Sequence, residues 1–479
     1  MSYHKFTKDI WIIGVTNVII VLRSLVLLPI ITKILGPDSY GIWVQIIAAL
    51  PFISLLATLG LPYAMVRFLA GEKDNKQFSD GFFSVITVVS AIILALAILI
   101  FSLSSQFSLL LGWPETIIKI LAALFLFECI NFVFLHVFRT LQKINLYSIF
   151  TILQSLGEIV FAVVAILLGY GLVGAVIGLL LVRVFCFLIS GLIILKQIRL
   201  QSPKFLKMRE YLKFGLPTIP GNISNWFVGF SDRYLIGYFL GLTFVGYYAP
   251  ACTLGAAAGF LGAPFSFLLP AAISKLHDED NLEDVKRYFK YSLKYFLAIA
   301  IPSFFGLSIL AKKILLMLST GDIASQGYLL VPFTALGMLL YSVYGIVYLV
   351  LILYKKTSLI GKIWVTAAVL NIALNFLLIP RFGIFIAALN SSLTYAFILV
   401  LTWICANKYL KIEIDWSFIL KSLLASILMS FFVILANPSG IVNLILTIFV
   451  GTIIYFAILL LLKSFKKSEV NFFTSFLKK

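Results

Sequence analysis

Six ionisable side chains lie within long apolar stretches of this sequence, where a charge is costly unless it is paired or functional. They are Arg23, Glu128, Glu158, Arg183, Asp232 and Arg233. An arginine suits phosphate because its planar guanidinium donates two parallel hydrogen bonds. A carboxylate held away from bulk water can exchange a proton or hold a cation. These residue types indicate arginines that receive an anionic headgroup and acids that bind a coupling ion.

Counting from the predicted turns places four of these side chains at one depth. The four are Arg23, Glu128, Glu158 and Arg183. Each lies roughly 20 Å from a turn at 1.5 Å per residue, which is near the centre of a bilayer. Asp232 and Arg233 are nearer to the turn at Gly241 and so to the outer face. The alternative to a functional site is a structural Glu158–Arg183 pair across one hairpin. Arg23 has no evident hairpin partner, which favours contact with a substrate.

A polar stripe marks the seventh predicted span. Its members share one helical face because their spacings alternate between four and three residues. They are Thr218, Asn222, Asn225, Gly229 and Asp232. The stripe fits either the wall of a hydrated path or hydrogen-bonded packing between helices. Asn17 precedes Leu35 by the same interval that separates Asn222 from Leu240, so a repeat predicts equivalent asparagines in two halves.

Composition identifies the elements that must position these groups. The chain is 62% hydrophobic and 12% charged, against about 45–50% and about 25% in soluble domains. A membrane helix needs about 20 apolar residues, which predicts about fourteen spans. The predicted spans are 10–32, 41–66, 82–103, 116–138, 146–168, 172–195, 214–240, 244–270, 291–311, 327–353, 359–379, 384–406, 417–436 and 441–462. We therefore expect an all-α, multi-pass integral membrane protein.

Three motif pairs suggest an internal repeat. LGPDSYG at 35–41 matches LGLTFVG at 240–246, LGLPY at 59–63 matches LGAPF at 261–265, and YGLVGA at 170–175 weakly matches FGIFIA at 382–387. Six spans separate the partners, so both copies have one orientation and are related by an axis along the membrane normal. The predicted domains are two pseudo-symmetric six-helix bundles at 1–200 and 201–410. Two C-terminal helices and a basic tail follow at 411–479.

The distribution of Lys and Arg among the loops predicts how the chain is oriented in the membrane. The loops assigned outside hold only Lys33, Lys312, Lys313 and Arg381, whereas most of the 37 basic residues lie on the other side. Both termini are therefore expected in the cytoplasm. The net charge of +18 then marks a membrane face that contacts anionic lipids, and nucleic acid is excluded as a partner.

Three segments resemble the polysaccharide flippases of the multidrug/oligosaccharidyl-lipid/polysaccharide exporter superfamily. They are FGLPTIPGNISNWFVGFSDR at 214–233, LGPDSYGIW at 35–43 and NIALNFLLIPRFGIFIAA at 371–388. The resemblance implies a bacterial inner-membrane flippase for undecaprenyl-pyrophosphate-linked oligosaccharides, as in O-antigen or capsule synthesis, working by alternating access. Arg23 matches a headgroup-binding position, and Asp232 with Arg233 matches an Asp-Arg pair. Coupling to H⁺ or Na⁺ is implied, and polysaccharide polymerase and chain-length proteins are candidate partners.

The site expectations follow from both lines of argument. The headgroup would be bound by Arg23, Arg183, Arg233, Asn17, Asn222 and Asn225, and the coupling ion by Glu128, Glu158 and Asp232. No metal site, cofactor or catalytic residue is expected, and the chain has no P-loop for ATP. Two alternatives remain open. A drug exporter of the same superfamily would favour an acidic cavity and about twelve helices. A polysaccharide polymerase or ligase would need a larger outer loop.

Overall fold

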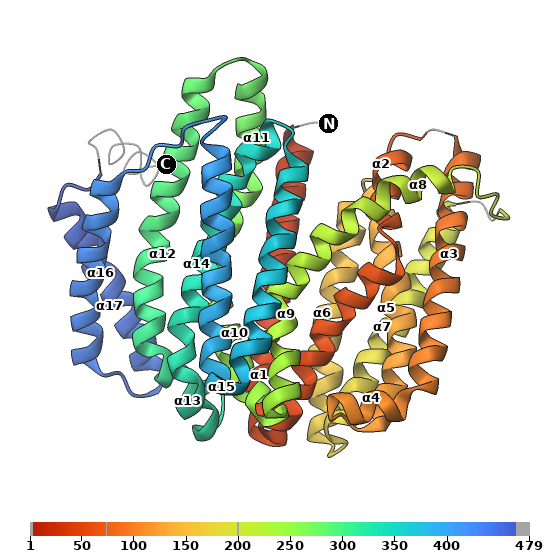
Figure 1. Ribbon diagram of the computed structural model, residues 1–479, viewed down its shortest axis with the longest axis horizontal. Helices are drawn as coiled ribbons and strands as arrows, with labels where there is room; N and C mark the ends of the chain where they lie inside the picture. Colours follow the sequence, from red (N-terminus) through yellow and green to blue (C-terminus); the bar gives the residue numbers. More distant parts are fainter. Residues whose placement is uncertain (1–2, 73, 199–200, 466–479) are drawn as a thin grey trace. The chain divides into compact units, whose positions relative to one another are not determined.

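The computed structural model describes residues 3–72, 74–198 and 201–465, and the regular elements in these ranges are all helical (Figure 1). The first nine α-helices are α1 (Tyr3–Ala57), α2 (Leu61–Leu69), α3 (Asn75–Ser102), α4 (Ser104–Leu111), α5 (Glu115–Thr140), α6 (Ile144–Leu167), α7 (Gly171–Gln197), α8 (Met208–Gly215) and α9 (Ile219–Leu240). The others are α10 (Leu242–Gly259), α11 (Ala263–Asp278), α12 (Leu282–Leu318), α13 (Gly321–Gly327), α14 (Val331–Leu353), α15 (Thr357–Ala406), α16 (Trp416–Ala436) and α17 (Gly440–Leu461).

Eleven helical stretches of the described chain are long and apolar enough to cross a membrane. Two of them contain a glycine with non-helical backbone, Gly36 in α1 and Gly383 in α15, and so each holds two segments. Helix α9 has 22 residues but carries Asp232 and Arg233, and it is not among the eleven. The all-helical expectation is confirmed, while the number of fourteen spans stays a prediction.

The second predicted span, 41–66, is interrupted. Helix α1 ends at Ala57 and α2 begins at Leu61, with Gly60 between them at φ 69°. An ideal Cβ on Gly60 would lie 2.4 Å from the carbonyl oxygen of Gly215. Glycine is therefore required twice over here, by the left-handed backbone and by the close approach of the end of α8. The break at the start of the seventh span is as its prolines predict, because a 3₁₀ turn at Leu216–Thr218 precedes α9.

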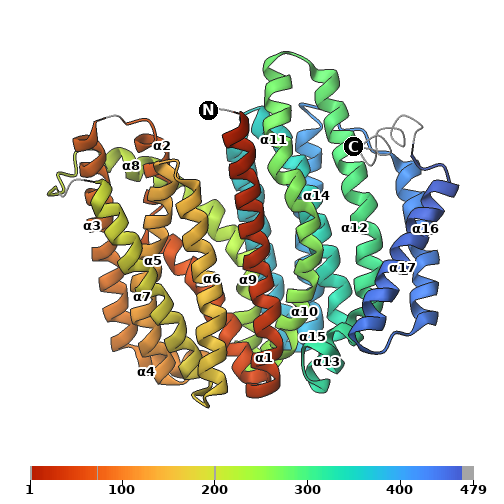
Figure 2. The ribbon, with the colours of Figure 1, turned by 180° about the vertical axis from the view of Figure 1, so that it is seen from behind.

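One compact unit comprises Met1–Ala249 together with Ile379–Gly383. Within it α6 packs against α1 and α7, and α5 packs against α3 and α7 (Figure 2). Its apolar core gathers side chains from α2, α3, α5, α7 and α8, among them Val85, Val133, Phe138 and Tyr211. This packing fixes the helices that carry the first four charged residues.

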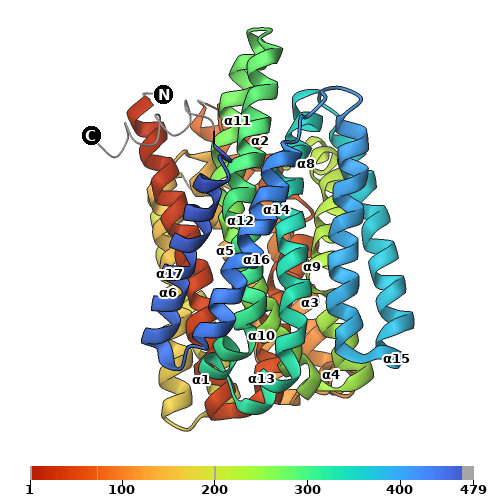
Figure 3. The same ribbon diagram turned by 90° about the vertical axis from the view of Figure 1, so that its left-hand side faces the viewer.

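The second compact unit comprises Pro250–Leu378 and Ile384–Lys479. Here α12 packs against α14 and α16, and α16 packs against α17 (Figure 3). A buried amide cluster joins the two segments of α15, since Asn390 Nδ2 donates to Asn375 Oδ1 at 2.8 Å and Asn371 Nδ2 to Thr394 Oγ1 at 2.9 Å. The predicted bundles at 1–200, 201–410 and 411–479 rest on the repeat and remain a prediction.

The first motif pair of the repeat meets in space. Gly36 and Gly241, equivalent in the two motifs, have similar backbone angles of φ 82°, ψ 179° and φ 98°, ψ 168°. An ideal Cβ on Gly41 would lie 2.5 Å from the carbonyl oxygen of Leu242, and one on Gly246 would lie 2.1 Å from that of Pro37. The end glycine of each motif thus faces the backbone of the other motif.

Candidate functional site

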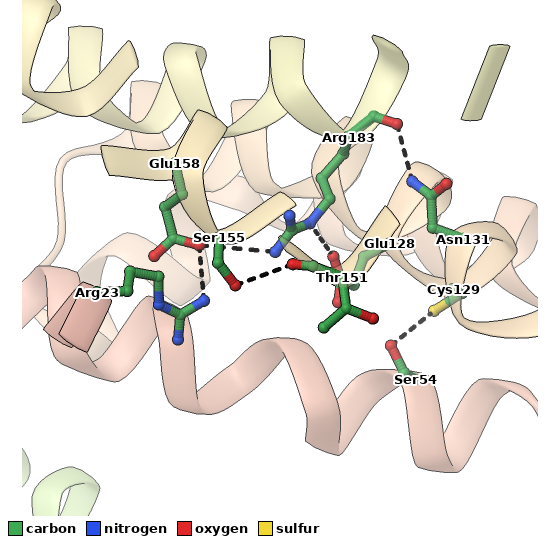
Figure 4. A network of polar contacts seen from close by, with 9 residues as sticks. All are labelled: Arg23, Ser54, Glu128, Cys129, Asn131, Thr151, Ser155, Glu158 and Arg183. Carbon is green, nitrogen blue, oxygen red and sulfur yellow. Dashed lines mark hydrogen bonds and ion pairs between the residues drawn. The ribbon is translucent and has the colours of Figure 1, made fainter. Parts of the chain in front are cut away.

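A network of alternating charges lies inside the first unit. Arg183 Nε on α7 donates to Glu128 Oε2 on α5, and Arg183 Nη2 lies 3.7 Å from Glu158 Oε2 on α6. The same Glu158 oxygen accepts a hydrogen bond from Arg23 Nη1 on α1 at 2.9 Å (Figure 4). Four helices therefore bring together the four side chains that the sequence places at one depth.

Exposure differs between the middle and the ends of this network. The side chains of Glu158 and Arg183 are 1% and 5% exposed, whereas those of Arg23 and Glu128 are 16% and 19% exposed. The order Glu128–Arg183–Glu158–Arg23 thus has a buried ion pair in the middle, a partly open carboxylate at one end and a partly open guanidinium at the other. An incoming anion would reach Arg23, and an incoming cation would reach Glu128.

Arg23 is paired, although the hairpin pattern offers it no partner. Its partner Glu158 lies 135 residues away in the chain, on a helix that packs along α1. Only the packing of α1 beside α6 reveals this contact. The expected Glu158–Arg183 pair is present as well, and it shares its carboxylate with Arg23.

The arginines keep donor capacity beyond these contacts. Arg23 Nε and Arg183 Nη1 are buried and make no hydrogen bond with the described part of the chain. A buried donor without a partner is unfavourable, so these atoms favour a site that an anionic oxygen or water completes.

Asn131 is a member of the site that sequence reasoning missed. Its Nδ2 donates to the backbone carbonyl of Arg183 at 2.8 Å, and Asn131 is 3% exposed. It lies one helical turn after Glu128 on α5, so its signal was a polar side chain three residues from an intramembrane acid. The contact fixes α5 against α7 at the arginine.

The second charged pair lies on α9. Asp232 is buried and accepts hydrogen bonds from Tyr248 Oη and from the backbone N–H of Arg233. The guanidinium of Arg233 lies 4.8 Å from the centre of the Phe230 ring. Asp232 is therefore held by α10, and Arg233 is held by a cation–π contact on its own helix.

The three expected asparagines are more open. Asn17 and Asn225 are exposed and Asn222 is half-buried. Gln45 in α1 is a further polar group that sequence reasoning missed. Its Nε2 donates to the carbonyl of Arg233 at 2.7 Å and its Oε1 accepts from Trp113 Nε1 at 2.8 Å. Gln45 thereby links α1 with α9 and with the turn between α4 and α5.

Two family models match the chain. The model described as polysaccharide biosynthesis protein covers residues 6–277, more than half of the sequence. The MatE model covers residues 217–377.

Relatives at low identity include glycan flippases. The chain is 23% identical over 274 residues to the probable low-salt glycan biosynthesis flippase Agl15 of Haloferax volcanii, which is 56% of this chain and 58% of that protein. It is 25% identical over 304 residues to the succinoglycan biosynthesis transport protein ExoT of Rhizobium meliloti, which is 61% of this chain and 58% of that protein. The matches thus span less than two thirds of either relative.

Solved structures share the fold. The lipid II flippase MurJ in an inward closed conformation has a TM-score of 0.76 at 18% identity, covering 94% of this chain and 98% of that one. An inward-facing multidrug resistance MATE family transporter of the MOP superfamily has a TM-score of 0.66 at 14% identity, covering 82% and 97%. These likenesses establish an all-helical membrane fold. With a family match over more than half of its length, the chain belongs to the polysaccharide biosynthesis protein family.

Proposed function

We propose that this protein flips undecaprenyl-pyrophosphate-linked oligosaccharide repeat units from the cytoplasmic to the outer leaflet of a bacterial inner membrane. Alternating access of two halves would carry the headgroup across, with both termini in the cytoplasm. O-antigen or capsule units are the substrate class, and a polymerase and chain-length proteins would receive the product. Family membership supports transport of a lipid-linked glycan.

The open arginine end of the charged network is the observation that carries the proposal. Arg23 is the most exposed cation of the network, and its Nε makes no hydrogen bond with the described residues. A pyrophosphate diester carries two negative charges and offers several oxygens to a guanidinium, whereas the Glu158 carboxylate carries one negative charge and contacts Arg23 through one oxygen. The headgroup would therefore take Arg23 from Glu158, while Arg183 continues to hold Glu158.

Ion coupling would use the acids of the same network. Displacement of Arg23 leaves Glu158 with one cationic partner, which favours uptake of H⁺ or Na⁺ by the Glu128–Glu158 pair. Headgroup release would restore the Arg23–Glu158 contact and expel the ion. Arg233, Asn17, Asn222 and Asn225 would contact the substrate elsewhere along its path, and Asp232 would be a second coupling position.

Substitution of Arg23 by Ala and by Lys tests the headgroup role through surface polysaccharide output, normalised to protein in the membrane. We expect a loss of about tenfold or more for Arg23→Ala, the size of a charge-assisted hydrogen bond, and partial activity for Arg23→Lys. The fold should persist because Arg183 still pairs with Glu158. Lys119→Ala, which removes an exposed ion pair with Glu115, is the matched control. Normal output from Arg23→Ala would remove this residue from the headgroup role.

Drug export is the second candidate function, favoured by the MatE match over residues 217–377. The two functions separate in one deletion strain. Drug export predicts restored drug resistance without restored polysaccharide, whereas glycan flipping predicts the reverse.

A further inference from the structure

A row of hydroxyl groups on α6 leads to the buried middle of the charged network. Ser148, Thr151, Ser155 and Glu158 follow spacings of three, four and three residues, so they share one face of the helix. Figure 4 shows Thr151 and Ser155 on the turns of α6 that precede Glu158. Ser148, Thr151 and Ser155 are called the hydroxyl row below. The row begins in the second turn of α6, near the end of this helix that is expected at the cytoplasmic face.

The hydroxyl row lies on the side of α6 that faces away from lipid. The exposed apolar residues on the same part of this helix are Ile149, Leu156 and Val160, which are 55%, 47% and 55% exposed. At about 100° per residue they lie roughly 140° around the helix from the row. Thr151, in the middle of the row, is nevertheless only half-buried. Exposure on this side indicates space beside the row that water can enter.

Each hydroxyl of the row can hold a water molecule. Thr151 Oγ1 donates to the carbonyl of Tyr147 at 2.8 Å and Ser155 Oγ to that of Thr151 at 3.0 Å, and both oxygens keep the capacity to accept. Ser148 Oγ is buried and makes no hydrogen bond within the described ranges, which is unfavourable unless water completes the site. Side chains one turn apart are separated by about 5–6 Å, the length of two hydrogen bonds through one water molecule.

The charges around Glu158 favour a proton over a metal cation. Glu158 Oε2 lies 2.9 Å from Arg23 Nη1 on α1 and 3.7 Å from Arg183 Nη2 on α7, and Glu128 on α5 contacts Arg183 in turn. A sodium ion bound to this carboxylate would keep its full charge beside at least one guanidinium. A proton instead forms a covalent O–H bond and gives a neutral carboxyl, which can donate to the hydroxyl oxygen of Ser155 one turn earlier.

We propose that the hydroxyl row conducts protons between the cytoplasmic end of α6 and Glu158, through water molecules that it orders. The proposal rests on the ion coupling of the proposed function and deepens it by naming the ion and its route. When Arg23 leaves Glu158, a hydronium ion at the solvent end gives its proton to the first water molecule of the row. Each water molecule passes on one proton as it receives one, and the last transfer forms the O–H bond of Glu158. No hydroxyl is ionised, and Glu158 gains the net proton.

Arg23→Ala provides a test that needs no substrate, because Glu158 then loses one of its two arginines. In the purified full-length variant a rapid drop in pH should protonate Glu158, and time-resolved infrared spectroscopy measures this through the C=O band of a neutral carboxyl. The part of the band that belongs to Glu158 should be missing when Arg23→Ala is combined with Glu158→Gln, where Arg183 still pairs with Glu128. A band of equal size in both proteins would overturn the proposal.

Loss of a hydroxyl should slow the growth of the Glu158 band without changing its final size. Combined with Arg23→Ala, we expect Ser155→Ala and Thr151→Val each to slow it roughly fivefold, the scale of one hydrogen bond, and Ser155→Thr to keep the rate. Ser303→Ala and Thr452→Val are matched controls in the second unit, because their hydroxyls also donate to the carbonyl four residues earlier. Unchanged rates in Ser155→Ala and Thr151→Val, equal slowing by the controls, or suppression of the band by sodium would each refute the proton row.

Undecaprenyl pyrophosphate separates a failure of this proposal from a failure of the proposed function. Added at constant pH to the protein with Arg23 in place, it should produce the same Glu158 band, because the headgroup takes Arg23. If it produces no band while the Arg23→Ala protein still responds to the hydroxyl substitutions, the headgroup role fails and the proton row stands. If the band grows equally fast with and without Ser155→Ala, the headgroup role stands and the proton row is refuted.

Discussion

At the scale of single residues, the function of the charged network depends on the contrast between its buried middle and its open ends. Glu158 contacts two arginines and its side chain is 1% exposed. Its carboxylate therefore offsets the positive charge of Arg23 and Arg183 at a place that water does not reach. Removing one partner of a buried ion pair is far more damaging than the pair is stabilising, because the other charge is left in a low dielectric. Glu158 is therefore expected to be structural as well as functional, whereas the ends can exchange partners.

The first prediction concerns stability. Glu158→Gln should lower the free energy of unfolding by about 3 kcal/mol or more, since Arg183 would then keep only Glu128 and Arg23 would lose the carboxylate that it contacts. Thermal unfolding of the purified protein in detergent measures this change. Glu115→Gln, on an exposed pair with Lys119, should leave the transition unmoved. A Glu158→Gln protein as stable as the unaltered chain would show that the network is not needed for the fold.

The second prediction concerns coupling. Glu128→Gln removes the open carboxylate and should slow glycan export in a way that depends on the ion gradient. Export by the unaltered protein should fall when an ionophore collapses the gradient, and export by the variant should respond less. If the variant and the unaltered protein export glycan at the same rate at every size of the ion gradient, Glu128 is not a coupling residue.

Residue types and depths were predictable from sequence, but partners were not. The four charged residues were identifiable because each interrupts an apolar run, and counting from turns placed them in one layer. The contact from Arg23 to Glu158 depends on which helices are neighbours. Asn131 and Gln45 were missed because a lone amide in a span gives no sign of its partner. Their roles follow only from the carbonyl groups that they reach.

At the scale of elements, the contact between the two repeat motifs allows no side chain. Gly41 faces the carbonyl of Leu242, and Gly246 faces that of Pro37. A methyl group at either position would press on backbone atoms, which cannot rotate away as a side chain can. The two repeat motifs therefore share a turn at Gly36 and Gly241 and bring α1 and α10 into close approach.

The third prediction follows from this approach. Gly41→Ala should destabilise the protein by about 1–3 kcal/mol, as overpacking does in other cores. Gly14→Ala is the control on the same helix, because an ideal Cβ there has nothing within 4 Å. Thermal unfolding of both variants measures the difference. Equal transition temperatures would mean that the two backbones separate without cost.

At the scale of the whole molecule, the sequence predicted the class of fold more securely than the places where its helices are interrupted and its units are divided. The length of the apolar runs predicted an all-helical membrane protein, because the thickness of the bilayer fixes how long a membrane-spanning helix must be. The corner at Gly60 within a predicted span could not be foreseen, since it depends on the close approach of Gly215 from a distant helix. The positions of glycines such as Gly36 and Gly383 indicated turns, and both have positive φ.

The fourth prediction is the orientation of the chain in the membrane, and α12 (Leu282–Leu318) tests it with two ends of one helix. Arg287 and Lys312 are both exposed and are separated by roughly 37 Å along the helix at 1.5 Å per residue, more than the hydrocarbon thickness. In a variant whose four native cysteines are replaced, a membrane-impermeant maleimide added to intact cells should label Lys312→Cys. It should label Arg287→Cys only after permeabilisation, because the basic loops are expected inside. The reverse pattern would place both termini outside and would invert the proposed direction of transport, whereas labelling of both sites in intact cells would mean that α12 does not cross the membrane.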